Sequence, residues 1–124
     1  MPRMQEQLTL SAVEGPAVLP GQLRASLTVP ASHPILVGHF PGAPLVPGVL
    51  LLQAVRQAFE EVTSRSFTIT AIDEVRWHAP LAPEVVATMQ ATVTALDTGV
   101  AIAGEWHSAA GRVAAFSLRL SPRS

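Results

Sequence analysis

A single stretch of helical periodicity, from Gly48 to about Ser64, constrains the fold most strongly, because most of the remaining sequence alternates as strands do. Its polar side chains recur at i, i+3, i+4, i+7 and i+8, as Gln53, Arg56, Gln57, Glu60 and Glu61. A wide apolar face covers the other positions, as Leu50, Leu51, Ala54, Val55, Ala58, Phe59 and Val62. A helix with so narrow a polar stripe is predicted to be buried along most of its surface. Pro47 suits its first turn, where a missing N–H has no cost.

Strand patterns flank this helix on both sides. Apolar residues alternate with polar ones in one half-buried strand, at Leu23, Ala25, Leu27 and Val29. Four long strands are predicted after the helix, over Phe67–His78, Val85–Leu96, Gly99–Ser108 and Arg112–Ser121. Hairpin-type connections at 97–99 and 109–111 separate the last three. The N-terminal segment, residues 1–22, has room for one short strand around Leu8–Val13. Residues 1–124 are therefore predicted to form a single α+β domain, a long antiparallel meander curled around one helix.

Composition narrows the classes of function. Charged residues make up 14% of the 124, against about 25% in an average protein, so some surface is expected to be hidden in an oligomer. The net charge of −1 argues against nucleic-acid binding, and the lack of cysteine excludes disulfides and thiolate chemistry. No apolar run is long enough to cross a membrane. With no apolar signal in the first twenty residues, a cytoplasmic protein is expected.

The proline-rich loop before the helix carries the first candidate for chemistry, His39. Histidine titrates near neutrality, at about 6.5, and a rigid loop could hold it as a general base. The unbonded N–H groups of Gly48 and Val49 at the helix start could bind a developing oxyanion. A base and an oxyanion site nine residues apart suit proton abstraction next to a carbonyl. The structural alternatives are a histidine that caps local backbone groups and a glycine that makes a tight turn.

Gln53 is the second candidate, and it begins the polar stripe of the helix. Its amide can donate and accept hydrogen bonds but cannot titrate, so it cannot serve as a general acid. The alternative is a solvent-exposed side chain. The other histidines, His33, His78 and His107, have no metal-ligand spacing, and the sequence predicts no metal site. It also lacks a phosphate-binding loop and a serine nucleophile motif.

Residues 38–54, GHFPGAPLVPGVLLLQA, resemble the signature GHFPGxPxxPGVLxxEA of the β-hydroxyacyl-ACP (acyl carrier protein) dehydratases. The identical positions are Gly38, His39, Phe40, Pro41, Gly42, Pro44, Pro47, Gly48, Val49, Leu50 and Ala54. A second stretch, residues 71–77 with Pro80 and Pro83, is similar to that family's IDxVRFxxPVxPGD. The sequence also looks like the shorter dehydratase-like proteins of aryl polyene and related polyketide-type clusters, some of which work as pairs of unlike subunits. The resemblance covers roughly residues 23–121 and implies the hot-dog fold, assembled as dimers.

The resemblance also implies a chemistry. The substrate would be a 3-hydroxyacyl thioester carried on the phosphopantetheine of ACP or on CoA, with no bound cofactor, and Phe40, Gly48 and Val49 would contact it. His39 would take the α-proton, with the protomers of a dimer each supplying part of the site. Gln53 stands where the family has the glutamate that helps the β-hydroxyl leave. Arg76 and Arg112 are candidates for docking an acidic carrier protein.

Three functions remain open from the sequence. The first is a dehydratase, a lyase of fatty acid or polyketide synthesis, in which Gln53 orients the hydroxyl or a water. The second is a non-catalytic or half-catalytic subunit that pairs with a glutamate-bearing paralogue, as a heterodimer instead of a homodimer. The third is an acyl thioesterase, for which Glu60 and Glu61 are the carboxylates on the helix.

Overall fold

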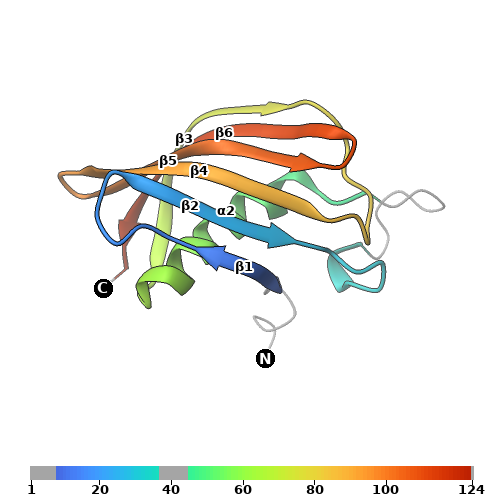
Figure 1. The fold of residues 1–124 in the computed structure, drawn as a ribbon, viewed down its shortest axis with the longest axis horizontal. Helices are drawn as coiled ribbons and strands as arrows, with labels where there is room; N and C mark the ends of the chain where they lie inside the picture. Colours follow the sequence, from blue (N-terminus) through green and yellow to red (C-terminus); the bar gives the residue numbers. More distant parts are fainter. Residues whose placement is uncertain (1–7, 37–44, 124) are drawn as a thin grey trace.

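The structure is a computed structural model that describes residues 8–36 and 45–123 of the chain. Among these residues there is one long helix, α2 (Gly48–Thr63), preceded by a short 3₁₀ helix, η1 (Pro34–Leu36). One sheet wraps around α2 (Figure 1). Its six strands are β1 (Leu10–Glu14), β2 (Gly21–Leu27), β3 (Phe67–Trp77), β4 (Ala87–Leu96), β5 (Gly99–Ser108) and β6 (Gly111–Pro122). The predicted α+β architecture, a long helix enclosed by an antiparallel sheet, is confirmed.

The order of strands in the sheet is β1-β2-β4-β5-β6-β3, and every neighbouring pair is antiparallel. The meander holds for β4, β5 and β6, but the prediction that it includes all four late strands is wrong. β3 pairs with β6 at the far edge of the sheet, so Trp77 faces Ala114. Alternation of side chains specifies which face of a strand is buried, not which strand lies beside it. A sheet that encloses a helix needs strands on both flanks, and β3 covers the flank opposite β1 and β2.

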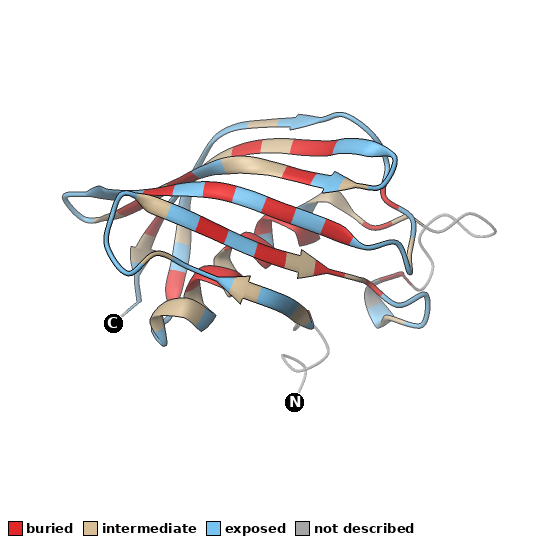
Figure 2. Cartoon of the chain, in the orientation of Figure 1, coloured by how far each residue is buried: buried red, intermediate tan, exposed pale blue. Residues whose placement is uncertain are grey.

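The core lies between the concave face of the sheet and α2. Figure 2 shows buried and exposed residues alternating along the strands that cross the middle of the sheet. The predicted inward residues of β2, together with Val29, are buried, and Leu23 and Ala25 lie opposite Ala91 and Met89 of β4. Seven residues of α2 are buried, namely Leu50, Leu51, Leu52, Ala54, Val55, Ala58 and Phe59. The apolar face predicted for the helix is confirmed, except that Val62 is only partly buried.

The polar stripe of α2 fastens the helix to neighbouring segments. Arg56 Nη1 and Glu60 Oε1 form an ion pair at 2.9 Å, one turn apart. The second carboxylate oxygen of Glu60 accepts the backbone N–H of Phe67 at 2.7 Å, where β3 begins. The side-chain amide of Gln57 bonds both the N–H and the carbonyl of Leu8, just before β1. These contacts place the start of β1 and of β3 on either side of the helix.

Candidate functional site at the start of the central helix

Helix α2 begins with backbone donors that no described residue uses. Pro47 is the N-cap, with φ −60° and ψ 135°, and its carbonyl accepts the N–H of Leu50 at 3.0 Å. No side chain caps this end, and the first turn holds no acidic residue. The N–H groups of Gly48 and Val49 therefore make no hydrogen bond within the described part of the chain. Such unbonded amides at a helix N-terminus favour a negatively charged oxygen.

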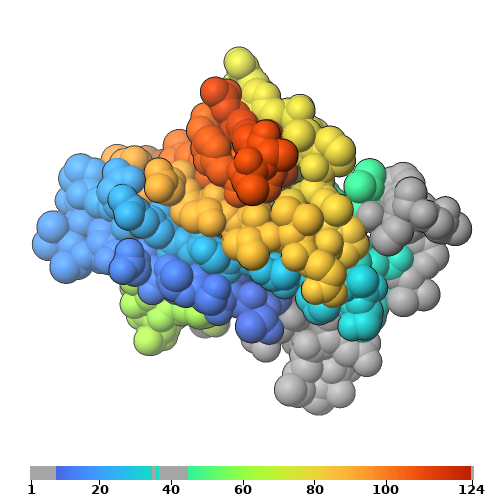
Figure 3. Space-filling view, turned by 45° about the vertical axis from the view of Figure 1, so that its right-hand side comes forward, coloured from blue at the N-terminus to red at the C-terminus, as the bar shows by residue number. Residues whose placement is uncertain are grey.

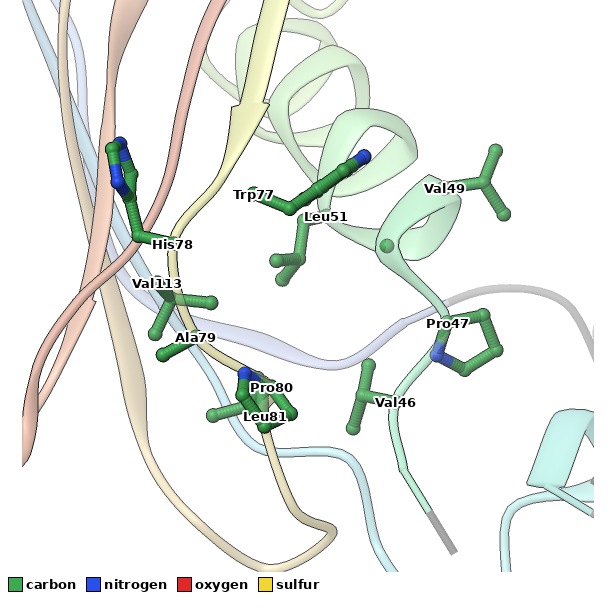
Figure 4. A pocket seen from close by; sticks show the side chains of 11 residues that line it. Val46, Pro47, Val49, Leu51, Trp77, His78, Ala79, Pro80, Leu81 and Val113 are labelled. Carbon is green, nitrogen blue, oxygen red and sulfur yellow. The ribbon is translucent and has the colours of Figure 1, made fainter. Parts of the chain in front are cut away.

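An apolar pocket of about 640 Å³ lies beside these two amides (Figure 4). The start of α2, the end of β3 with the segment after it, and β6 supply its lining: Val46, Pro47, Gly48, Val49, Leu51, Trp77, His78, Ala79, Pro80, Leu81 and Val113. In Figure 4 the side chains of Val46, Leu51 and Val113 surround the hollow. The ring of His78 and the side chain of Val49 point away from it, so Val49 borders the pocket mainly through its backbone.

Backbone hydrogen bonds hold the walls of this pocket together. The N–H of Val46, just before the helix, donates to the carbonyl of Leu81 at 2.8 Å. On the other side, the N–H groups of His78 and Ala79 donate to the carbonyl of Val113, at 2.8 and 3.2 Å. Residues far apart in sequence therefore meet at the N-terminus of the helix. The pocket is formed by the tertiary fold and not by one local motif.

Trp77 is one of several pocket residues that the sequence did not indicate as part of a site. Its indole ring packs against Gly48 so closely that a Cβ at position 48 would lie 2.6 Å from Cη2 and 2.8 Å from Cζ2 and Cζ3. Real Cβ atoms do not approach a ring carbon so closely, so a larger residue at position 48 would force the half-exposed ring of Trp77 to shift. Neither close approach of a substrate nor a tight turn, the two reasons considered from sequence, includes this contact. A large aromatic residue at the end of the strand after the helix was the available signal.

Gln53 lies on an exposed face of α2, one turn beyond Val49. Unlike Arg56, Gln57 and Glu60 of the same stripe, its side chain makes no hydrogen bond with a residue that the structure describes. The amide is therefore available to a ligand, a partner chain or water. His39 and Phe40 lie outside the described residues, so the structure brings together Gly48 and Val49 only, with Gln53 on the adjoining helical face.

A second tryptophan, Trp106 of β5, connects the centre of the sheet to the helix. It is fully buried, and its indole N–H donates to the carbonyl of Leu51 at 3.2 Å. Leu51 is itself a pocket residue in the first turns of α2. This bond connects the N-terminal part of α2 directly to the sheet.

The remaining charged candidates are engaged within the chain. Arg76 pairs with Glu74 at 2.7 Å, and Arg112 lies 3.6 Å from Glu105, so both candidate docking arginines have local acidic partners. The described residues contain no cluster of three or more histidine, aspartate or glutamate side chains suited to a metal ion. None of the helices within 8–36 and 45–123 has the length and apolar character needed to cross a membrane.

Comparison with solved structures defines the class of protein as the hot-dog fold. One similar structure is the dehydratase heterocomplex ApeI:P from Xenorhabdus doucetiae, with a TM-score of 0.72 and 16% identity over 93% of this chain and 98% of that chain. Another is the putative thioesterase yhdA from Lactococcus lactis, with a TM-score of 0.73 and 7% identity over 96% of each chain. At these identities the likeness establishes the fold alone.

Sequence comparison gives the family. The sequence model of the ApeI-like family, described as ApeI dehydratase, matches residues 17–111, so the chain belongs to the ApeI-like dehydratase family. Similar curated proteins include the 3-hydroxyacyl-[acyl-carrier-protein] dehydratases FabZ of Cronobacter sakazakii and Pseudoalteromonas translucida. The first is 34% identical over 87 residues, 63% of this chain and 58% of that protein. The second is 39% identical over 74 residues, 52% of this chain and 49% of that protein. These matches span between about half and three fifths of the relatives' lengths.

Proposed function

We propose that this protein acts on 3-hydroxyacyl thioesters of an acyl carrier protein or CoA, as a dehydratase-like subunit of fatty acid or polyketide/aryl polyene synthesis. One observation carries the proposal: the backbone N–H groups of Gly48 and Val49, which bond no described residue, lie beside an apolar pocket. Removal of the α-proton turns a thioester carbonyl into an oxyanion, which such amides stabilise. Membership of the ApeI-like dehydratase family and the similarity to FabZ support the same chemistry.

In the proposed reaction, His39 accepts the α-proton and the electron pair of that C–H bond forms the new Cα=Cβ bond. The Cβ–O bond breaks, and the β-hydroxyl leaves as water after it gains a proton. Gly48 and Val49 donate their N–H groups to the thioester oxygen. This oxygen carries the negative charge after the α-proton is removed and before the Cβ–O bond breaks. Phe40 contacts the substrate beside His39 in this proposal. No metal or redox cofactor is needed for the electrons to balance.

The proton for the leaving hydroxyl distinguishes two versions of this function. Gln53 cannot supply it, because an amide does not titrate. In the first version, Gln53 orients the hydroxyl or a water and the homodimer dehydrates slowly. In the second version, the chain is a half-catalytic subunit whose His39 works with a glutamate of a paralogous partner. The amide of Gln53 is exposed and bonds no residue in the described part of the chain, which supports the second version, because another chain could contact this face of α2.

A thioesterase is the weaker alternative, although a putative thioesterase shares the fold. Hydrolysis on this fold would need a carboxylate near the helix. Glu60 is already bonded to Arg56 and to the N–H of Phe67, and Glu61 accepts a hydrogen bond from Gln57 at 3.2 Å. Both carboxylates therefore have structural partners away from the pocket.

Assembly as a dimer is part of the proposal. β3 is the edge strand of the sheet, and it exposes half of Ile72. An apolar edge of this kind is rarely left uncovered in a stable protein. We expect a second chain, identical or paralogous, to pair along β3. A monomer measured by light scattering at micromolar concentration would contradict this.

The decisive experiment measures formation of the enoyl thioester from a 3-hydroxyacyl-ACP, with the purified protein alone and mixed with a co-encoded paralogue that carries the glutamate. We expect little product from the protein alone and clear turnover from the mixture. Ordinary turnover alone would favour the first version. Hydrolysis to a free acid in either sample, without enoyl product, would favour the thioesterase.

A further inference from the structure

Trp77 occupies an unusual position for a large aromatic residue. It is the last residue of β3, its ring faces the start of α2, and 52% of its surface is exposed. It does not belong to the hydrophobic core, although it lines the pocket. The side chain therefore contributes to the wall of the pocket more than to the packed interior.

The ring is braced on one side. The contact with Gly48 leaves no room for even a methyl group between the indole and the helix. Trp77 is also held by its strand, because β3 pairs with β6 up to the Trp77–Ala114 pair. A bound ligand therefore cannot widen the pocket by pushing the ring toward the helix.

The other walls that the described residues form offer no charge to a ligand. Val46, Pro80, Leu81 and Val113 face the hollow, and the one titratable residue among the lining residues, His78, points its ring away (Figure 4). An ammonium group placed here would lose its hydration without a partner among the described residues, and a carboxylate would find partners only at the N–H groups of Gly48 and Val49. An uncharged apolar group is the occupant that fits.

We propose that Trp77 is a specificity-determining residue, which sets the width of the apolar acyl group that the pocket admits. This inference rests on the proposed function, since it takes the occupant to be the acyl part of a thioester. A rigid apolar wall discriminates by size, and one methylene group in such a pocket changes binding by about 10- to 200-fold. A smaller side chain at position 77 would widen the pocket, so a bulky or ring-bearing acyl group gains more affinity from the change than a narrow chain does.

The test uses two thioethers that no enzyme activity can consume, S-hexyl-pantetheine and S-(4-phenylbutyl)-pantetheine. Binding to the wild type, Trp77→Phe and Trp77→Leu is measured by calorimetry. Leu96→Ala is the control, because Leu96 is an exposed apolar residue of β4 that does not line the pocket. We expect the affinity ratio of the phenylbutyl to the hexyl probe to rise about tenfold in Trp77→Leu, less in Trp77→Phe, and not in Leu96→Ala.

Tryptophan fluorescence gives a second readout. Trp106 is fully buried, so a blue shift on addition of S-hexyl-pantetheine reports Trp77, and Trp77→Phe should abolish it. An unchanged affinity ratio in Trp77→Leu would overturn the inference and leave the proposed function standing. The same holds if Trp77→Leu instead breaks the dimer in light scattering, since the ring would then be covered by a partner. Failure of both probes to bind the wild type would overturn the proposed function together with the inference.

Discussion

Trp106 and Leu51 connect the two layers of the molecule through one buried hydrogen bond, from the indole N–H to the main-chain carbonyl at 3.2 Å. Trp106 lies on a central strand of the sheet, and Leu51 lies in the turn of α2 that borders the pocket. The donors of Gly48 and Val49 are therefore positioned relative to the sheet by a residue more than fifty positions away in sequence.

Trp106→Phe should lower the free energy of unfolding by about 2 kcal/mol, because it removes a buried donor and leaves a small void. Urea denaturation measures this change. Trp77→Phe is the matched control: Trp77 is half exposed and makes no hydrogen bond with a described residue, so its cost should stay below about 1 kcal/mol. Equal costs for the two substitutions would show that the Leu51 bond contributes nothing.

Gly48→Ala should destabilise the protein by about 1–3 kcal/mol, since the new methyl group collides with the ring of Trp77. In a Trp77→Ala background the same substitution should cost less, with a coupling of about 1 kcal/mol. Thermal unfolding of the wild type, both single variants and the double variant measures the coupling. Additive costs would mean that the strain lies in the backbone of Gly48 and not in its contact with Trp77.

Glu84 combines a strained backbone conformation with a side-chain hydrogen bond to the main chain. Its φ is +68°, a left-handed value that favours glycine, while its carboxylate accepts the N–H of Ala31 at 2.8 Å. Glu84→Ala keeps the strained conformation and loses the bond, so it should destabilise the protein by about 1 kcal/mol. Glu84→Gly loses the bond but relieves the strain, and should be more stable than the alanine variant by about 1 kcal/mol. If alanine proves the more stable of the two, the conformation at residue 84 is not strained.

His39→Ala should reduce enoyl formation by about 10²–10⁴-fold, the contribution typical of a general base. The initial rate is measured with the catalytically competent assembly, either homodimer or mixed dimer. His107→Ala is the control, because His107 is exposed and bonds Glu105. Circular dichroism should show the same fold in both. A rate within a few-fold of the wild type would remove His39 from the mechanism.

Gln53→Glu should raise dehydration by the homodimer, by as much as about 10²–10⁴-fold if the new carboxyl group is well placed. The reason is that the substitution restores a group that can carry a proton. Gln22→Glu makes the same change of charge on an exposed part of β2 and should leave the rate unchanged. A wild-type homodimer that already turns over at ordinary enzyme rates, with no gain from Gln53→Glu, would contradict the missing-acid explanation.

The sequence predicted local structure well, because local structure depends on periodicity. The helix and the last three strands begin and end within about two residues of the prediction, and Ser64 ends the helix with φ +57° and a bond from its N–H to Glu60. The position of β3 beside β6 could not be predicted from a pattern that does not specify neighbours. The prediction of Gln53 as a site residue is untested, and it is exposed in the single chain.

The candidate site was indicated by the sequence signature of residues 38–54 more than by the periodicity of the chain. Gly48 and Val49 were expected at a helix start, and the structure places them there. The contact between Trp77 and Gly48 was not predictable, since it joins the end of one strand to the helix before it through the curvature of the sheet. Arg76 is paired with Glu74, and Arg112 with Glu105. These pairs depend on side-chain rotamers that a sequence does not reveal.

The pairing of β3 with β6 also has a consequence for folding of the chain during its synthesis. Trp77 emerges during synthesis well before Val113 and Ala114, the residues that hold its strand end and the segment after it. Until β6 has been made, β3 has no strand to pair with, and the apolar hollow at the helix start has one wall missing. The apolar face of α2 therefore lacks part of its cover until β6 has been made, and the pocket is completed in the same step that pairs β3 with β6.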